Sequence, residues 1–361
     1  MIKPLTSLRF FFAFIVFCSH LSFFRNSNNE TLKNIYYGIL KEGYLGVSFF
    51  FILSGFILAY NYQNKFLEKK ACFRNFVFAR WARIYPLHLI TFFIAIPYTV
   101  SSLGESPYIW IKKALSNLFL IHSFSGDPST YFSFNLVSWS ISDEWFFYIA
   151  FPFIIYLISK IKHTLSKILI SSVIILIPIL FYILLPENQK LHHSLFYVNP
   201  LFRVIDFFIG IFLFNIFTNQ KVKSFFNKNS NILEFSSLCI FLLFFIFHKE
   251  VNQTLRFSVY YWVPMSFIIL TFAFQKGYLS RILSNKILIH LGEISFGVYM
   301  FHQLILRYLN DIKGEFLFIN NEIILFMVGL ILTLIISHIS HKFYETPVNK
   351  WLKKNFIKKK N

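Results

Sequence analysis

The sequence predicts an all-α polytopic membrane protein with about ten transmembrane helices. Of its 361 residues, 56% are hydrophobic, 51 are phenylalanine and only 14% are charged, which is too apolar for a soluble globular protein of this length. Apolar runs close to the length of a bilayer span recur along the whole chain. The predicted spans are 5–24, 43–62, 84–100, 137–159, 168–185, 200–217, 233–248, 257–274, 287–309 and 323–341.

The distribution of positive charge predicts the orientation of these spans. A net charge of +19 could indicate a nucleic-acid partner. However, 23 of the 35 lysines and arginines lie in the N-terminus, the even-numbered loops and the C-terminus, whereas nine lie in the opposite loops. By the positive-inside rule both termini are cytoplasmic. The basic charge therefore reflects topology in a lipid bilayer, and we expect no nucleic-acid partner.

The first span carries two ionisable residues, Arg9 near its start and His20 near its end. It follows Lys3 and lacks a small-residue cleavage site, so we interpret it as a retained helix. Eleven residues make about three helical turns, so both side chains share one face, on the order of 16 Å apart. An arginine inside an apolar span should face protein or a water-filled cavity. We hypothesise a slot in which Arg9 holds an anionic donor and His20 does chemistry; the alternative is that both snorkel to the interfaces.

The second span contains small residues that leave gaps in side-chain bulk, namely Gly43, Gly46, Ser54 and Gly55. Small residues let helices approach closely. The residues alone are equally compatible with pure packing and with a substrate channel that Ser54 would line.

The loop predicted at 63–83 ends in the sequence RWARIYP, in which Arg80 and Arg83 are three residues apart. Residues at this spacing are neighbours on one helical face. Two guanidiniums at a membrane mouth suit phosphate groups, because the planar fork binds oxyanions bidentately. The alternative is an anchor to anionic lipids.

The fourth span follows the longest non-cytoplasmic loop, 101–136, which could cover an outward-facing site. Asp143 and Glu144 lie in its first turns, where acids complement the helix dipole. The functional hypothesis is that Glu144 orients His20 or another catalytic group. Trp139 is either an interface-belt residue or a stacking platform for a sugar ring.

Later spans carry further polar residues. Arg203 and Asp206 are spaced for a structural ion pair within one helix. His302 lies nine residues after Glu293, on roughly the opposite helix face, and is either a polar group of the cavity or a packing histidine. We expect no metal site. The three scattered cysteines favour neither a metal site nor a disulfide framework, and the histidine pairs His192–His193 and His338–His341 have no accompanying ligands nearby.

Several stretches taken together, in order and over nearly the whole chain, resemble the bacterial membrane acyltransferase family 3. The matching stretches are the leucine-rich start with Arg9, ten residues and His20, then GYLGVSFFFILSGFIL, ARIYPL, WSISDEWFFYIAFP with Glu144, LGEISFGVYMFHQ and YETP with Glu345. The chain departs from the family where Ala79–Arg80 replaces a frequent arginine pair, where Ile141 replaces a usual leucine, where Phe296 replaces a usual tyrosine, and where Asp206 stands in place of a common glutamate.

The resemblance implies a transmembrane acyltransferase domain at 1–345, followed by a basic cytoplasmic tail at 346–361, in the bacterial inner membrane. It implies transfer of an acyl group, most often acetyl from acetyl-CoA, to a hydroxyl of a cell-envelope glycan. His20 and Glu144 would be catalytic; Arg9, Arg80 and Arg83 would bind the donor; Trp139, Ser54 and His302 would contact substrate. A histidine can act as general base on the sugar hydroxyl or take the acyl group itself.

Two other functions use the same residues. A transporter or flippase of lipid-linked glycan would use the buried charges as a permeation path, although no matched half-repeat is evident. A membrane scaffold would need them only for folding. The acceptor, the identity of the acyl group and the oligomeric state are not predicted by the sequence.

Overall fold

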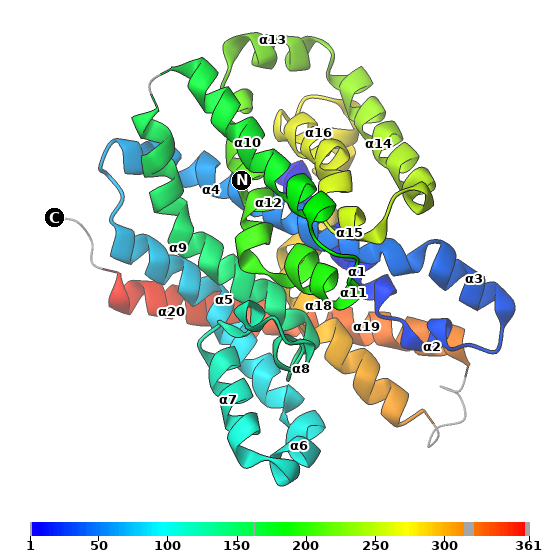
Figure 1. The fold of residues 1–361 in the computed structure, drawn as a ribbon. Coiled ribbons are helices and arrows are strands. Elements are labelled where there is room, and N and C mark those ends of the chain that lie inside the picture. Colours follow the sequence, from blue (N-terminus) through cyan, green and yellow to red (C-terminus); the bar gives the residue numbers. More distant parts are fainter. Residues whose placement is uncertain (1, 162, 314–320, 358–361) are drawn as a thin grey trace.

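The computed structural model describes residues 2–161, 163–313 and 321–357, and within these ranges every regular element is a helix. This confirms the all-α class (Figure 1). Each predicted span falls largely on one of the long helices. These are α1 (Lys3–Ser19), α4 (Leu45–Leu67), α5 (Phe73–Ala95), α9 (Trp139–Lys160), α10 (Thr164–Leu184), α12 (Pro200–Phe217), α14 (Ser230–Ile246), α16 (Trp262–Ala273), α18 (Lys286–Asp311) and α19 (Glu322–Ser340).

Five helical stretches are long and apolar enough to cross a membrane. They are Glu30–Leu67, Leu136–Lys160, Gln189–Phe217, Ser230–Glu250 and Glu322–Phe356. Two shorter apolar helices lie at Leu169–Leu184 and Val259–Ala273. Helix α1 has 17 residues, fewer than any of the five long stretches, and α5 carries three arginines. The number of crossings and the cytoplasmic position of the termini stay predictions.

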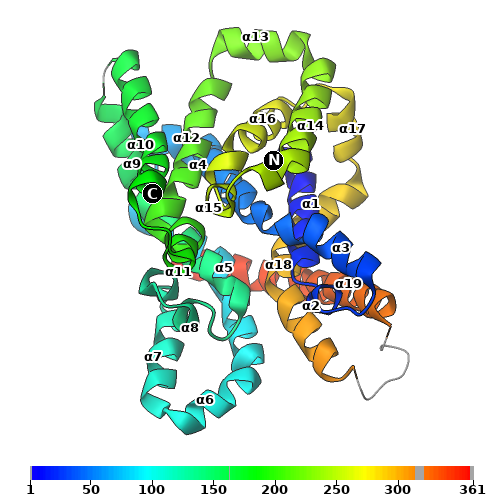
Figure 2. The ribbon, with the colours of Figure 1, turned by 45° about the vertical axis from the view of Figure 1, so that its right-hand side comes forward.

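Short helices connect the long ones. They are α2 (Ser22–Arg25), α3 (Glu30–Gly38), α6 (Val100–Glu105), α7 (Pro107–Leu118), α8 (Pro128–Tyr131), α11 (Gln189–His192), α13 (Gln220–Lys228), α15 (Gln253–Arg256), α17 (Tyr278–Leu283) and α20 (Thr346–Phe356). The 101–136 segment, predicted as a loop, forms α6, α7 and α8. In Figures 1 and 2, α6 and α7 project from one end of the bundle and α13 lies across the other.

Glycines allow α4 and α12 to touch backbone to backbone. A Cβ on Gly55 of α4 would lie 1.9 Å from the carbonyl oxygen of Phe207, and a Cβ on Gly210 of α12 would lie 1.9 Å from that of Ile52. No side chain fits at such a separation, so both positions require glycine for close approach. The packing interpretation of Gly55 is therefore confirmed.

Glycines also allow two elements to pack closely against α1. A Cβ on Gly43 would lie 2.0 Å from the carbonyl oxygen of Ile15, and a Cβ on Gly292 of α18 would lie 1.9 Å from that of Thr6. Helix α1 is therefore held between the 3-10 turn Leu40–Tyr44, which precedes α4, and helix α18 (Figure 2). This arrangement sets Arg9 and His20 against side chains from distant parts of the sequence.

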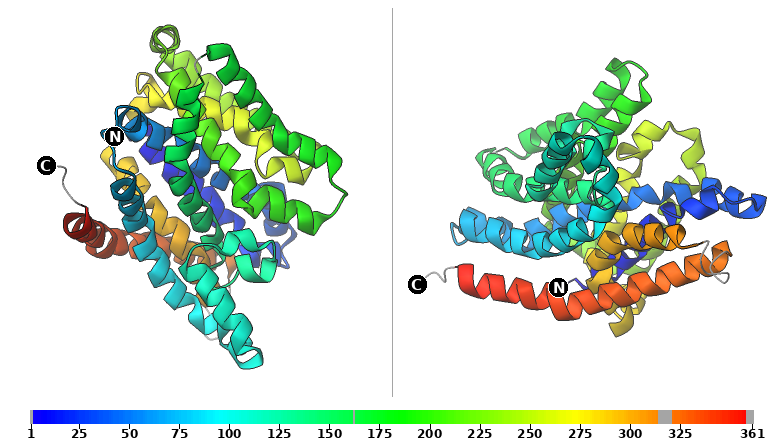
Figure 3. Two further views of the ribbon diagram at one scale, coloured as in Figure 1. Left: turned by 60° about the vertical axis from the view of Figure 1, so that its left-hand side comes forward. Right: turned by 90° about the horizontal axis from the view of Figure 1, so that it is seen from below.

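The first part of the predicted C-terminal tail is helical. Helix α19 passes through a π-helical turn, His341–Glu345, into α20, and together they form a long rod along one side of the bundle (Figure 3). Helix α20 packs on α5, where the Phe356 and Phe78 ring centroids are 5.6 Å apart. Of the predicted tail, 358–361 lies outside the described residues.

Candidate active site

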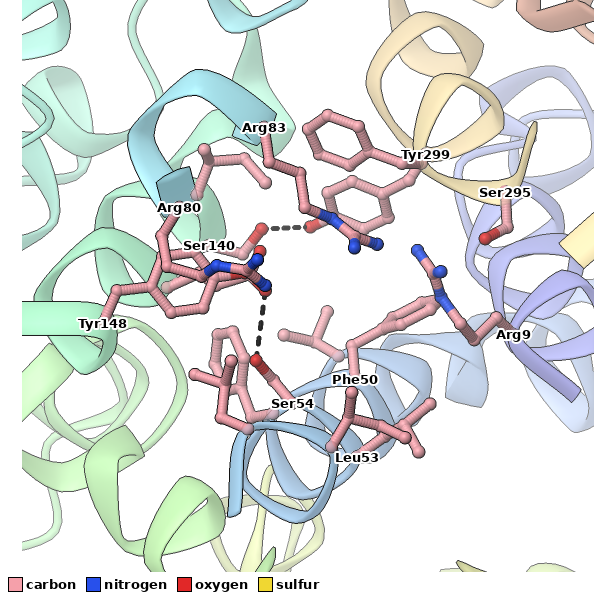
Figure 4. A pocket seen from close by; sticks show the side chains of 17 residues that line it. Arg9, Phe50, Leu53, Ser54, Arg80, Arg83, Ser140, Tyr148, Ser295 and Tyr299 are labelled. Atoms are coloured by element: carbon pink, nitrogen blue, oxygen red, sulfur yellow. Dashed lines mark hydrogen bonds between the residues drawn. The ribbon is translucent and has the colours of Figure 1, made fainter. Parts of the chain in front are cut away.

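Three arginines surround one cavity between α1, α4, α5, α9 and α18. The cavity holds about 780 Å³ of empty space. In Figure 4 the guanidiniums of Arg9, Arg80 and Arg83 point into this space from different sides. The structure thus brings together the three residues that the sequence predicts to bind an anionic donor, although they come from two separate helices.

The position of Arg80 and Arg83 follows from a longer helix than the sequence predicts. The 63–83 segment is mostly helical, because α4 continues to Leu67 and α5 begins at Phe73. Both arginines therefore lie on the second and third turns of α5, on the face that lines the cavity. The Arg80 Nη2 donates a hydrogen bond to the hydroxyl of Tyr62 at 3.4 Å, and its guanidinium lies over that ring.

The positive charge of this cavity is only partly offset, by Glu144 in the cavity itself and by Glu293 and Glu345 in an adjoining cavity that Arg9 and Arg83 also line. Among the described residues, neither Arg9, Arg80 nor Arg83 forms an ion pair. Glu144 supplies the single carboxylate that lines the cavity, so three guanidiniums against one carboxylate leave two positive charges. Unpaired charges in a membrane-embedded cavity are costly and mark ligand sites. The geometry is suited to a polyanion.

Glu144 makes no hydrogen bond or ion pair with His20 among the described residues, and the hypothesis that it orients His20 or another catalytic group stays a prediction. Its carboxylate accepts hydrogen bonds from the hydroxyls of Ser54, at 3.2 Å, and of Tyr148. Ser54 thus lines the cavity, as the channel interpretation of the second span required, whereas the neighbouring Gly55 serves packing. Glu144 therefore lines the cavity that contains the three arginines, whereas its neighbour Asp143 is fully buried.

A second cavity adjoins the first and shares Arg9 and Arg83 with it. It holds about 1410 Å³ and is lined by residues from the start of α1, the end of α4 and the start of α20, including Ile2, Asn61 and Asn349. These helix ends belong to the side predicted to be cytoplasmic. The two cavities share the guanidiniums of Arg9 and Arg83, and the carboxylates of Glu293 and Glu345 also line the second one.

His20 lies at the C-terminal end of α1, directly after Ser19. Its Nδ1 is 2.9 Å from the carbonyl oxygen of Val16 and 3.2 Å from Nε2 of His302 on α18. His302 is fully buried, and its Nδ1 is 2.7 Å from the carbonyl oxygen of Tyr299. The structure therefore pairs the two histidines that the sequence analysis singled out separately.

His20 lines neither of the two cavities described above. The residue that connects the two regions is Tyr299: its side chain lines the arginine cavity, and its carbonyl contacts His302. The hydroxyl of Tyr299 lies 2.6 Å from that of Ser140. The predicted slot is therefore present around Arg9, and its continuation to His20 stays a prediction.

Trp139 is not at a surface that could stack on a sugar. It is 2% exposed, and its ring packs 4.7 Å from Tyr197 and 6.4 Å from Phe51, measured between centroids. The structure places Trp139 in the core.

The predicted ion pair of α12 is confirmed, because Arg203 Nη2 lies 2.9 Å from Asp206 Oδ2 and both side chains are fully buried.

Sequence reasoning missed Tyr299 and Ser295 as cavity residues, and it missed the contact of Tyr148 with Glu144. Tyr148 follows Glu144 by four residues, which is the spacing of neighbours on a helix, so this contact could have been found. Tyr299 and Ser295 had no such signal, because their place depends on how α18 packs against α1.

Within the described residues, no three His, Cys, Asp or Glu side chains are placed to hold a metal ion.

The chain is similar to known acyltransferases. Acyltransferase MdmB of Streptomyces mycarofaciens is 35% identical over 164 residues, which cover 44% of this chain and 41% of that protein. O-acetyltransferase OatA of Staphylococcus aureus (strain NCTC 8325) is 22% identical over 331 residues, which cover 86% of this chain and 53% of that protein. The chain therefore spans about half the length of these relatives or less.

No solved structure matches the chain. A family model described as an acyltransferase domain matches residues 4–341, from the first turn of α1 to the turn that follows α19. The match includes every helix that lines the arginine cavity, and also both histidines of the α1–α18 contact. The chain belongs to the acyltransferase 3 family.

Proposed function

We propose that the chain is an integral membrane O-acyltransferase. It takes an acyl group, most often acetyl, from cytoplasmic acyl-CoA and transfers it to a hydroxyl of a cell-envelope glycan. The observation that carries this proposal is the cavity lined by Arg9, Arg80 and Arg83, none of which forms an ion pair among the described residues. Arg9 lies eleven residues before His20, which directly follows the same helix. The names of the relatives support the acetyl group, and the family supports acyl transfer.

The arginine cavity suits the donor. Coenzyme A carries its negative charge on phosphates, and guanidiniums bind phosphate oxygens with paired, charge-assisted hydrogen bonds. Arg83, which lines both cavities, is exposed, whereas Arg9, which also lines both, and Arg80, which lines the first, are half-buried. Phosphates held here leave the pantetheine arm to extend along α1, toward His20, on the order of 16 Å from Arg9 along the axis.

His20 supplies the chemistry at the far end of this path. In direct transfer, its free ring nitrogen takes the proton of the acceptor hydroxyl while the oxygen bonds to the thioester carbon. The carbon–sulfur bond then breaks, and the same proton passes to the departing sulfur to give the free thiol of CoA. In the alternative route the nitrogen bonds to the thioester carbon, and the carbon–sulfur bond breaks to release CoA as its thiolate. The acceptor oxygen then bonds to the acyl carbon as the carbon–nitrogen bond breaks, and the hydroxyl proton passes to the CoA thiolate. Both routes need the same unprotonated nitrogen.

The proposal is tested with radiolabelled acetyl-CoA and the envelope glycan of cells that lack this chain. Membranes containing the native protein should label the glycan, whereas membranes containing His20→Ala or Arg9→Ala, inserted at the same level, should not. Normal glycan acetylation by a properly inserted His20→Ala protein would contradict the catalytic assignment. Transport of glycan without label in any fraction would favour a flippase instead.

A further inference from the structure

We infer that His302 is a positioning residue that holds His20 in one tautomer, with the proton on Nδ1 and the reactive lone pair on Nε2. The inference rests on the proposed function and deepens it. It is carried by the contact between α1 and α18, in which two imidazoles and three backbone carbonyls fix where each proton lies.

The protonation of His302 follows from its neighbours. Its Nδ1 lies 2.7 Å from the carbonyl oxygen of Tyr299 and 3.1 Å from that of Val298. A carbonyl oxygen only accepts hydrogen bonds, so Nδ1 of His302 carries a hydrogen. In the neutral ring, Nε2 then bears a lone pair, and this nitrogen faces His20 at 3.2 Å.

The protonation of His20 follows in turn. Its Nδ1 lies 2.9 Å from the carbonyl oxygen of Val16 and also faces the Nε2 lone pair of His302. The Ser19 hydroxyl oxygen lies 3.4 Å from the same nitrogen and donates its own hydrogen to the carbonyl of Val16 at 2.7 Å. All three neighbours are therefore acceptors toward Nδ1 of His20, so this nitrogen carries the hydrogen. Nε2 of His20 is therefore the nitrogen with the free lone pair, and it is the atom that can act as base or nucleophile.

The pair resembles a catalytic triad in which a neutral ring stands in place of the acid. Among the described residues no carboxylate pairs with either histidine, because the His–carboxylate pairs involve His248 and His290. When Nε2 of His20 takes the acceptor's proton, the Nδ1–H of the resulting imidazolium donates more strongly to His302. His302 thereby steadies the charged intermediate and keeps the ring aimed, without contacting substrate itself.

The enzymatic test compares His302→Leu with His302→Gln, which returns an amide oxygen near the position of Nε2. We expect His302→Leu to lower kcat roughly tenfold or more and to leave the KM for acetyl-CoA unchanged, and we expect His302→Gln to recover most of the kcat. His88→Leu is the matched control, because His88 is equally buried but bonds to the carbonyl of Asn117. It should lower thermal stability without this loss of kcat.

The structural test is nuclear magnetic resonance of the native protein with isotope-labelled histidine, with the His20 signal assigned by its loss in His20→Ala. A His20 signal protonated on Nδ1 supports the inference, and one protonated on Nε2 overturns it, whether or not the variants fold. A His302→Leu protein that keeps the native kcat, measured beside an inactive His20→Ala protein, would also overturn the inference and would leave the proposed function intact. Absence of any glycan labelling by the native protein would instead refute the proposed acyl transfer.

Discussion

The Ser54 hydroxyl on α4 donates a hydrogen bond to the Glu144 carboxylate on α9 over 3.2 Å. Tyr148, one turn further along α9, donates to the same oxygen. These two hydroxyls hold the single carboxylate that lines a cavity with three guanidiniums. Glu144 is therefore placed to reduce the repulsion among the arginines when no donor is bound.

This placement predicts the effect of Glu144→Gln. The substitution keeps the shape of the side chain and removes its charge, so phosphates should bind more tightly, by about 1 kcal/mol or roughly fivefold in Kd. The protein without ligand should melt at a lower temperature, because the arginines lose their counter-charge, and CoA should then raise its Tm by more than in the native protein. Isothermal titration with CoA and melting curves in detergent measure both effects.

The control for this variant is Glu68→Gln, since Glu68 lies between α4 and α5 and pairs with Lys70 outside the cavity. It should leave the affinity for CoA unchanged. A Glu144→Gln protein that binds CoA normally and loses most of its kcat would show instead that the carboxylate takes part in the reaction.

Removing a guanidinium from the cavity should weaken donor binding. Arg80→Ala or Arg83→Ala should cost about 1.5–3 kcal/mol of CoA binding, roughly ten- to a hundredfold in Kd, because a hydrogen bond to a charged group is lost. Arg74→Ala is the matched control on the same helix, because Arg74 is exposed and does not line either cavity. Equal losses for Arg74 and Arg80 would indicate non-specific attraction by the basic surface, and titration at two salt concentrations makes the comparison.

The sequence was sufficient for the parts of the fold that depend on hydropathy. The span predicted at 200–217 has the same limits as α12, since Pro200 and Asn199 form a typical helix start and the apolar run is uninterrupted. It failed at α5, where Arg74, Arg80 and Arg83 gave the first three turns the composition of a loop. Arg80 and Arg83 are tolerated on this helix because they border a cavity instead of lipid, and Arg74 is exposed in its first turn.

The site was predicted only where its residues are close in the sequence or are anomalous in their surroundings. Arg9, Arg80 and Arg83 could be named because a charge in or beside an apolar span requires a reason. The contact between His20 and His302 could not be predicted, because 282 residues separate them and it depends on α18 lying against α1. The glycine at 292 permits that contact, but no spacing rule connects it with Thr6.

The orientation of the helices is testable by labelling. In a protein whose native cysteines are replaced, Ser129→Cys on α8 should react with a membrane-impermeant maleimide added to intact spheroplasts. Lys70→Cys, between α4 and α5, should react only after the membrane is opened, since the excess of positive charge places that segment inside. The reverse pattern would invert the topology and would place the opening of the donor cavity on the outer side.

The crossing of α4 and α12 predicts the largest loss of stability from a small change. A Cβ at Gly55 would lie 1.9 Å from the Phe207 carbonyl oxygen, so Gly55→Ala must push the two helices apart. We expect a loss of about 1–3 kcal/mol, seen as a lower Tm and a lower yield of folded protein in detergent. Gly38→Ala at the end of α3 is the control, because nothing lies within 4 Å of its Cβ position. Replacing that glycine should be neutral or should stabilise the protein by about 0.4–1 kcal/mol.

Because Ser54 is adjacent to Gly55, the separation of the helices should also displace the Ser54 hydroxyl from Glu144. The Gly55→Ala protein that survives should therefore bind CoA with altered affinity, whereas unchanged Tm and unchanged affinity together would show that the two helices do not cross at these glycines.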